Sequence, residues 1–213
     1  DFCLSRGLGD VYKRQGKKRL FLVECQIDQQ EITGYADTGT EDKMSRVGIF
    51  LADGFEEIEG LTVVDILRRA GIDISMISIN GKKKVTGAHG IALDTDEDIV
   101  QCDLDKLDML VLPGGMPGTM NLAACEKLTE ALKKADQEKR GIAAICAAPS
   151  VLGDLGFLKG KKAVCYPGFE SRLTGAEVLA VPVVTDGHIT TSRGMGTAIA
   201  FALELTKRLK DEE

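Results

Sequence analysis

The sequence predicts an α/β protein, a three-layer α/β/α sandwich with a mainly parallel sheet. Short apolar runs of strand length alternate with segments whose apolar residues recur every three or four positions. Some of these runs are apolar throughout, which is typical of strands buried on both faces of a parallel sheet. Strands separated by helices imply right-handed crossovers and therefore helices on both faces. No internal repeat or linker divides residues 44–213, so we expect one domain there.

Residues 1–43 do not share this pattern. They mix glycine, charge and isolated apolar residues without a sustained period, whereas Met44 is followed at once by a strand pattern. Residues 4–15 resemble translated sequencing-adapter read-through. We therefore expect 1–43 to be a leader outside the domain, disordered or artefactual.

The N-terminal half of the domain predicts three strands, over residues 47–52, 72–79 and 108–112. A helix follows the first strand, ends at Gly71 and has apolar residues at helical spacing: Ile58, Leu61, Val64 and Leu67. A less regular section with an acidic run, Asp94–Asp98, separates the second and third strands. Asp65 and Arg69, four residues apart, predict a local ion pair.

The C-terminal half begins with a helix whose apolar positions are Leu128, Leu132 and Ala135. After the strand that starts at Gly141, further strands are predicted over 163–165, 178–184 and 189–192. A final helix carries Ile199, Leu203 and Leu209 on its expected apolar face.

Cys146 lies where a buried strand meets a helix. Residues 141–145 are apolar, and Pro149 fits only the first turn of a helix, where no amide donor is required. Cys146 is therefore expected on a sharp turn, the geometry of a nucleophile elbow, although it lacks the flanking glycines of that motif. Nearby amides and the helix dipole would favour a thiolate. The alternative is that Cys146 is a small buried hydrophobe.

Composition excludes several classes of partner and site. The formal net charge of −6 argues against nucleic acid and anionic membranes. No apolar run has the length of a membrane span, and we expect no secretion signal. The six cysteines are scattered, which suits a reducing cytoplasm better than a disulfide framework. With two histidines in the chain we expect no metal site.

Two further features are expected at the carboxyl edge of the sheet, where ligands of such folds bind. Gly114 and Gly115 follow a strand and let backbone amides approach a ligand oxygen, or they form only a tight turn. Glu59 lies about one turn into the first helix, beside Ile58. Partial burial would raise its pKa and keep it protonated, whereas an ordinary surface glutamate is the alternative. Glu56 and Glu57, at the helix start, are expected to be solvated.

Four segments together resemble the ThiJ/PfpI superfamily, and within it the branch of DJ-one, the Parkinson-disease-associated protein deglycase, and its bacterial relatives. These segments are Asp53–Glu59, Leu112–Gly115, Ala143–Pro149 and Thr191–Thr197. The resemblance implies a flavodoxin-like fold, a homodimer and no cofactor. It also implies that Cys146 is the elbow nucleophile, that Glu59 is its protonated partner, and that the amides of Gly115 and Ala147 line an oxyanion site beside Gly114.

The sequence departs from two branches of that superfamily. Ala147 stands where the protease-like branch has a histidine, which disfavours peptidase chemistry. Tyr166 stands where the eukaryotic glyoxalases have an additional site histidine, and tyrosine is a poor general base near neutral pH. His188 is expected to be structural. His89, in a glycine-rich loop, is expected to be solvated or, as the alternative, to approach a dimer partner's site.

These observations indicate a cysteine-dependent glyoxalase or deglycase that converts small dicarbonyls such as methylglyoxal to 2-hydroxy acids, in protection against carbonyl and oxidative stress. The alternative is a redox sensor or chaperone whose Cys146 is oxidised to a sulfinate. A thiazole-biosynthesis or amidotransferase-like role is disfavoured, because the sequence has no ammonia-accepting domain or cofactor motif.

Overall fold

A computed structural model describes residues 45–210, so the predictions made for residues 1–43 lie outside the described residues. Its seven-stranded sheet has the order β10-β11-β7-β6-β1-β2-β5. Every pair in it is parallel except β10 with β11. The strands are β1 (Arg46–Leu51), β2 (Asp73–Ser78), β5 (Glu97–Asp98), β6 (Met109–Leu112), β7 (Gly141–Ile145), β10 (Val183–Asp186) and β11 (Ile189–Ser192).

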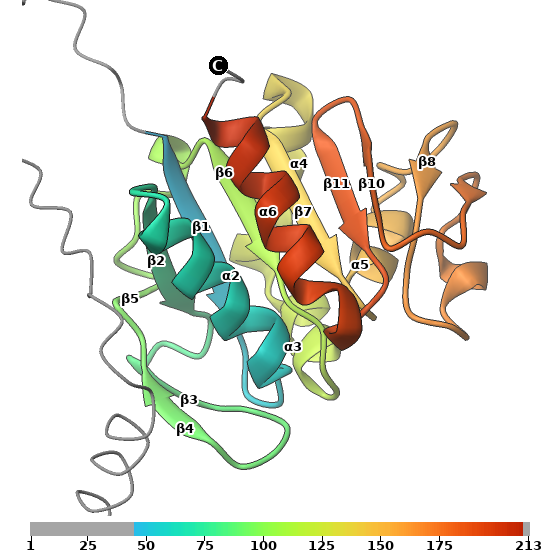
Figure 1. The fold of residues 1–213 in the computed structure, drawn as a ribbon. Helices are drawn as coiled ribbons and strands as arrows, with labels where there is room; N and C mark the ends of the chain where they lie inside the picture. The colour runs from blue at the N-terminus through green and yellow to red at the C-terminus, as the bar shows by residue number, and fades with distance from the viewer. Residues whose placement is uncertain (1–44, 211–213) are drawn as a thin grey trace, which may run out of the picture. The chain divides into compact units, whose positions relative to one another are not determined.

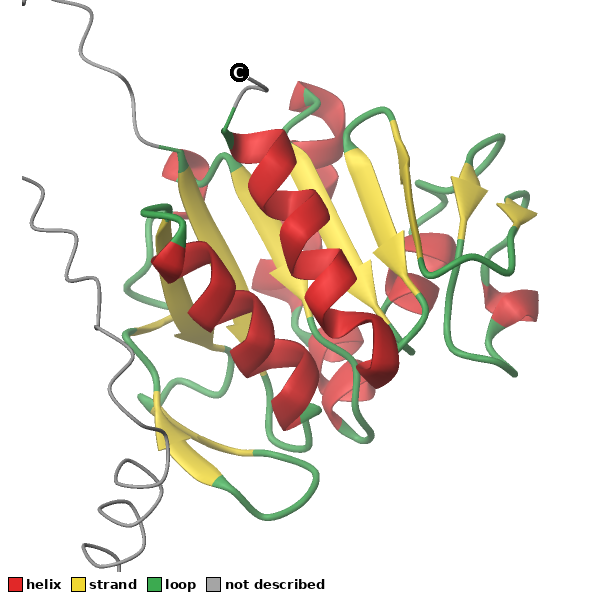
Figure 2. Ribbon diagram, viewed as in Figure 1, coloured by secondary structure: helices red, strands yellow, loops and turns green. Residues whose placement is uncertain are grey.

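Helices cover both faces of this sheet (Figures 1 and 2). One face carries α2 (Glu57–Arg69) and α6 (Ala198–Leu209), which contact each other. The other carries α3 (Gly118–Ala124), α4 (Glu126–Glu138) and α5 (Pro149–Asp154). The predicted three-layer α/β/α sandwich with a mainly parallel sheet is therefore confirmed.

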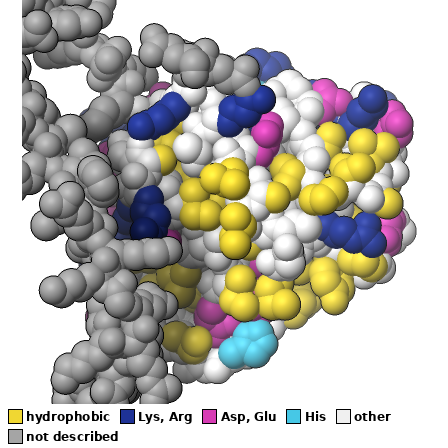
Figure 3. Space-filling model, viewed as in Figure 1, with side chains coloured by type: hydrophobic (Ala, Val, Ile, Leu, Met, Phe, Trp, Pro, Cys, Tyr) yellow, Lys and Arg dark blue, Asp and Glu magenta, His cyan; other side chains and the backbone are white. Residues whose placement is uncertain are grey.

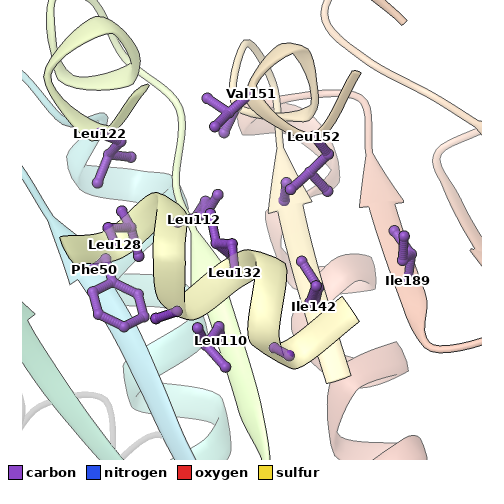
Figure 4. Close-up of a cluster of buried hydrophobic side chains, with 14 of the residues drawn as sticks. Phe50, Leu110, Leu112, Leu122, Leu128, Leu132, Ile142, Val151, Leu152 and Ile189 are labelled. Carbon is purple, nitrogen blue, oxygen red and sulfur yellow. The ribbon is translucent and has the colours of Figure 1, made fainter. Parts of the chain in front are cut away.

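Each face of the sheet has its own apolar core. Figure 4 shows part of the core under α3, α4 and α5, where strand residues such as Leu110 and Leu112 meet Leu128 and Leu132 of α4. The opposite core, under α2 and α6, contains Val63, Leu67 and Phe201. All of these side chains are fully buried, and burial of each large aliphatic or aromatic side chain contributes roughly 2 kcal/mol to folding.

The section between β2 and β6, whose structure the sequence does not predict, contains an antiparallel hairpin of β3 (Lys84–Thr86) and β4 (Ala92–Asp94). The edge strand β5 and the 3-10 helix η1 (Leu104–Lys106) follow it. These strands have two or three residues each, too short to show a period of 2.

The prediction of one strand over 178–184 is wrong. The chain forms β9 (Glu177–Val178), paired with β8 (Lys162–Ala163), and then β10 in the main sheet. Pro182 lies between β9 and β10, and a proline interrupts a strand because it has no amide hydrogen to donate. The strand predicted over 163–165 is likewise shorter, ending at Ala163. Two 3-10 helices complete this half, η2 (Glu170–Arg172) and η3 (Met195–Thr197).

The expected apolar faces of α2 and α6 are wrong in part. Ile58 is 49% exposed, and Ile199 and Leu203 are 63% and 56% exposed. The buried sides of the two helices are lined instead by Gly60, Val63, Val64 and Leu67, and by Ala198, Phe201, Ala202 and Leu205. Figure 3 shows hydrophobic side chains gathered on the face that these two helices form. The apolar stripe therefore extends round each helix to solvent.

Candidate active site

Cys146 lies on the turn between β7 and α5. Its φ is 66°, a left-handed conformation that is uncommon for a residue with a side chain. Two backbone hydrogen bonds fix it: its amide donates to Ser192 O at 3.0 Å, and its carbonyl accepts from the Tyr166 amide at 2.8 Å. Because β7 pairs with both β6 and β11, Cys146 stands at the carboxyl edge of the middle of the sheet. This is the strand-to-helix elbow that the sequence predicts.

Glu59, in the first turn of α2, faces Cys146 from the neighbouring part of the site. Glu59 is 1% exposed, so it is buried almost completely, whereas the sequence predicts only partial burial. Its Oε2 accepts a hydrogen bond of 2.9 Å from the Gly114 amide. The other carboxyl oxygen, Oε1, has no hydrogen-bond partner within residues 45–210, and the carboxyl group lies close enough to the Cys146 thiol for each group to shift the pKa of the other.

Gly114 and Gly115 allow this close approach. A Cβ atom at Gly114 would lie 2.6 Å from Cys146 Cβ and 2.6 Å from Glu59 Oε2. Gly115 has a φ of 94°, and a Cβ there would overlap the carbonyl oxygen of Gly54 at 2.5 Å. Neither position accepts a side chain without a backbone shift. The amides of Gly115 and Ala147 both reach the Cys146 sulfur.

Burial sets the protonation of the pair. It raises the pKa of Glu59 from 4.5 to about 7, although the bonds from Cys146 and the Gly114 amide oppose the rise. Burial, and then the charge of Glu59, raise the pKa of the Cys146 thiol to about 12, against the lowering effect of the Ala147 and Gly115 amides. The expectation of a low-pKa thiolate is therefore wrong. The reason is that a buried anion beside another anion is disfavoured more strongly than two amides favour it.

The Glu59 contribution depends on the protonation state of the carboxyl group. A protonated Glu59 carries no charge and can donate a hydrogen bond to sulfur, so one proton held between the two groups removes the repulsion, which is the second cause of the raised thiol pKa after burial. The two residues therefore form one acid–base unit.

An acid–histidine pair, Glu57 with His89, lies beside this unit, and the sequence does not predict it. Glu57 is 4% exposed rather than solvated, and its Oε2 lies 2.8 Å from His89 Nδ1. Burial raises the pKa of Glu57, but hydrogen bonds from His89 and backbone amides lower it more. The residues at the start of α2 do not indicate that Glu57 pairs with His89, because His89 lies in a loop 32 residues further along the chain.

Glu56 completes this group with His89, since one ligand atom from each of Glu56, Glu57 and His89 lies within 4.8 Å of the others. That donor set has the geometry of a cation site. However, the buried carboxylate is already satisfied by the His89 ring and amide, which bond to it at 2.8 Å each. The observed contacts are those of a structural hydrogen-bonded pair.

The remaining residues considered from sequence occupy different places. Tyr166 is half exposed beside Gly194, near the Cys146 sulfur. His188, 9% exposed, lies 2.7 Å from Asp136 Oδ1 and precedes β11, at the sheet edge opposite to Cys146. Asp65 and Arg69 form the predicted pair at 2.8 Å. None of the helices described between residues 45 and 210 is long and apolar enough to cross a bilayer.

Fold and site together define a class: α/β-sandwich proteins with a cysteine on a strand-to-helix elbow beside a buried carboxyl group. The sequence matches the DJ-1/PfpI family over residues 45–208, and the chain belongs to that family.

Sequence relatives come from plants, animals and archaea. The chain is 38% identical over 170 residues to protein DJ-1 homolog B of Arabidopsis thaliana, covering 79% of this chain and 39% of the relative. It thus spans about two fifths of the length of that relative. A Pyrococcus abyssi protein named a deglycase is 34% identical over 168 residues, covering 78% of this chain and 99% of its own.

Solved structures of the family have the same fold. Drosophila melanogaster DJ-1beta superposes with a TM-score of 0.75 at 35% identity, covering 79% of this chain and 92% of that one. Oxidised Toxoplasma gondii DJ-1 gives a TM-score of 0.75 at 34% identity, covering 78% and 91%. The flavodoxin-like fold implied by the resemblance is confirmed.

Proposed function

We propose that this protein is a cysteine-dependent glyoxalase or deglycase that converts small dicarbonyls, such as methylglyoxal, to 2-hydroxy acids. The observation that carries the proposal is the Cys146 thiol beside a buried carboxyl group whose pKa is close to neutral. A family relative from Pyrococcus abyssi carries the name deglycase, which supports the same class of chemistry.

Addition to the aldehyde is the first step. The Cys146 sulfur attacks the aldehyde carbon while its proton passes to the Glu59 carboxylate. The carbonyl oxygen becomes an oxyanion, which the amides of Gly115 and Ala147 stabilise by hydrogen bonding, with Gly114 leaving room for it. Glu59 then returns the proton to this oxygen, and the product is a hemithioacetal.

Isomerisation and hydrolysis follow. The Glu59 carboxylate removes the hydrogen of the former aldehyde carbon as a proton, forming an enediolate, and returns it to the adjacent carbon, while the hydroxyl proton of the former aldehyde oxygen passes to the former ketone oxygen. The result is a thioester of the 2-hydroxy acid on Cys146. Water cleaves this thioester, releasing the acid and the free thiol. The net reaction adds one water and needs neither an oxidant nor a reductant.

Glu59 suits these transfers because a pKa near the working pH allows a group both to accept and to donate protons. The same property explains how Cys146 reacts although its own thiol pKa is raised. Its proton has an acceptor in direct contact, so attack and proton transfer are coupled. Tyr166 would border the substrate without acting as a base.

We propose that the active form is a homodimer in the cytoplasm and that it protects against carbonyl and oxidative stress. The exposed side chains Ile58, Ile199 and Leu203 form an apolar face on α2 and α6, and Met195 of η3, which leads into α6, is 53% exposed. Apolar patches of this kind mark protein–protein contact sites. Ile58 lies next to Glu59 in sequence, so such a dimer would cover one side of the active site.

A second candidate function rests on the same carboxyl group. A protonated Glu59 facing a sulfur that also receives two backbone amides would stabilise the oxygens of a sulfinate, and Cys146 would then act as a redox sensor or in a chaperone-like role. The raised thiol pKa makes this the weaker candidate, because the thiolate is the form that peroxide oxidises.

One experiment separates the two candidates. The purified protein is incubated with methylglyoxal without glutathione, and D-lactate is measured over time. In parallel, Cys146 is examined by mass spectrometry after mild peroxide treatment. Sustained lactate production with an unoxidised Cys146 is expected. No lactate, together with rapid sulfinate formation, would contradict the glyoxalase proposal and support the sensor.

A further inference from the structure

The start of α2 has no side-chain cap. Glu56, its N-cap residue, makes no capping hydrogen bond through its side chain, and its backbone amide donates instead to Gly114 O at 2.9 Å. The first amides of a helix have no partner within the helix, so a first turn without a cap needs other groups to hold it. This turn carries Glu59, so whatever holds it decides where the acid of the candidate site lies.

Two buried carboxyl groups anchor this turn from different sides. Glu57 and Glu59 are 4% and 1% exposed, and residues two positions apart point to different sides of a helix. Glu59 accepts its hydrogen bond from the Gly114 amide. Glu57 accepts hydrogen bonds from the amide and the ring of His89, at 2.8 Å each. Because the two glutamates share one helical turn, loss of the second anchor displaces the first.

A hairpin loop fits closely over Glu57. This loop, residues 87–91, joins β3 to β4 and lies at the N-terminal end of α2 (Figure 1). A Cβ atom at Gly87 would overlap the Glu57 carboxyl group, so only glycine lets the loop pass there. The Ala88 amide adds a hydrogen bond of 2.8 Å to Phe55 O, just before the helix. The loop therefore encloses the buried carboxylate and holds the turn in front of it.

On its other side, the same turn packs against the glycines of the candidate site. The Gly118 amide donates to Gly54 O at 3.1 Å. A Cβ atom at Gly115 would lie 2.5 Å from the same carbonyl oxygen, so the two backbone segments are in direct contact. The Gly115 amide in turn reaches the Cys146 sulfur. The turn thus lies between the His89 loop and the backbone that faces the nucleophile.

We infer that His89 and Glu57 are positioning residues: their pair holds the first turn of α2 so that the Glu59 carboxyl group and the Gly115 amide face Cys146. Glu56, whose carboxylate lies 3.6 Å from His89 Nδ1, adds its charge to the pair. This inference rests on the proposed function for its turnover readout. The reactivity of the Cys146 thiol reports on the same geometry without turnover.

The test compares His89→Ala with His89→Asn. The His89 side chain is 67% exposed, so its removal leaves no buried cavity. Asparagine can place an amide donor near the position of the imidazole Nδ1, whereas alanine has no donor. In His89→Ala, kcat for D-lactate from methylglyoxal should fall about tenfold with KM within about twofold, because small displacements of reacting groups slow the chemistry. His89→Asn should restore kcat to within about threefold of the parent value.

Alkylation of Cys146 by iodoacetamide, followed by mass spectrometry, is the second readout. Displacement of the Glu59 carboxylate in His89→Ala takes a negative charge away from the thiol, so the rate at pH 8 should rise at least about threefold. Cys165 is the internal reference and should not change, since a general loosening of the fold would raise its rate as well.

His188→Ala is the matched control. His188 also pairs with a carboxylate, that of Asp136 at 2.7 Å, but at the sheet edge opposite to Cys146. Its loss should lower the thermal stability and leave both kcat and the alkylation rate of Cys146 unchanged. A purely structural role for His89 predicts the same result for His89→Ala.

Parent-like kcat and Cys146 alkylation in a folded His89→Ala protein would overturn the inference. Equal effects of His89→Ala and His188→Ala, or no recovery in His89→Asn, would also overturn it, because the loss would not then depend on the donor that binds Glu57. No lactate from the parent protein contradicts the proposed function instead, and the alkylation rates of Cys146 then decide the inference alone.

Discussion

Glu59 Oε2 accepts a hydrogen bond of 2.9 Å from the amide of Gly114, and this bond fixes the orientation of the carboxyl group beside Cys146. The carboxyl group belongs to a residue that is 1% exposed. The same glycine has no Cβ atom that would separate the carboxyl group from the thiol. Gly114 therefore has two roles: its amide orients the Glu59 carboxyl group, and its lack of a side chain lets that group lie beside Cys146.

The free energy of unfolding of the Glu59→Gln variant, relative to that of the parent protein, should be higher at pH 8 than at pH 5. The pKa of Glu59 rises from 4.5 to about 7 on folding, so the folded state binds the proton more tightly. The contribution of Glu59 to the free energy of unfolding is present in full below pH 4.5 and is lost as the pH rises through 7. The corresponding loss is up to about 3 kcal/mol. Glutamine does not ionise, so the difference in free energy of unfolding between variant and parent should grow from pH 5 to pH 8.

Glu57→Gln is the matched control for that measurement, because the two glutamates share one helix and both are buried. The pKa of Glu57 is lowered on folding, so its stabilisation is present at high pH and is lost on acidification. The variant should therefore lose stability relative to the parent at pH 8. The same sign for both variants would contradict the assigned environments.

Glu59→Gln should also lower the pKa of the Cys146 thiol. Burial and the charge of Glu59 together raise the pKa of this thiol to about 12. The substitution removes that charge, while the amides of Ala147 and Gly115, which lower the pKa, remain. The rate of alkylation of Cys146 by iodoacetamide, followed by mass spectrometry against pH, measures the change. Cys165 is the internal reference and should not change, because its raised pKa of about 11 has burial and then Glu170 as its causes and no contribution from Glu59. An unchanged Cys146 profile would mean that Glu59 is not its electrostatic partner.

Gly114→Ala should reduce turnover of methylglyoxal at least about tenfold. Its Cβ would lie 2.6 Å from both Cys146 Cβ and Glu59 Oε2, so the nucleophile and the acid must move apart, and small displacements of reacting groups are costly. Steady-state kinetics with a thermal unfolding curve measures the effect. Gly196→Ala is the control, because a Cβ there meets nothing within 4 Å. Equal activity of both variants would contradict the proposed geometry.

Leu203→Asp should convert a dimer to a monomer. Leu203 is 56% exposed on the apolar face of α2 and α6, where a dimer would have to bury the new charge without a partner. Light scattering coupled to size exclusion measures the mass. Lys133→Asp, exposed on α4 at the opposite face of the sheet, is the control. A monomeric parent protein, or a Leu203→Asp dimer, would contradict the proposed interface.

Much of the fold follows from local pattern in the sequence. The strand of residues 141–145 and the Pro149 helix start predict the elbow at Cys146, because both signals are contiguous in the chain. The hairpin of β3 and β4 was not predicted, since strands of three residues show no period. Pro182 is the signal that no single strand covers 178–184, because its missing amide hydrogen interrupts the apolar run.

The candidate site was predictable in position but not in electrostatics. Glu59 and Cys146 were identified, yet the raised pKa of the thiol depends on how deeply the two groups are buried together, which no local pattern encodes. The pairing of Glu57 with His89 joins residues 32 positions apart.

The central claim is that Cys146 is the nucleophile, and comparison of Cys146→Ser with Cys125→Ser tests it most directly. Cys125 is free and half-buried at the N-terminus of α4, where serine is a favourable cap. Each protein is assayed for D-lactate from methylglyoxal without glutathione. Cys146→Ser should lose at least about a thousandfold in kcat, since an alcohol is a far weaker nucleophile than a thiol, while Cys125→Ser keeps the parent rate. Full turnover by a folded Cys146→Ser protein would contradict the account.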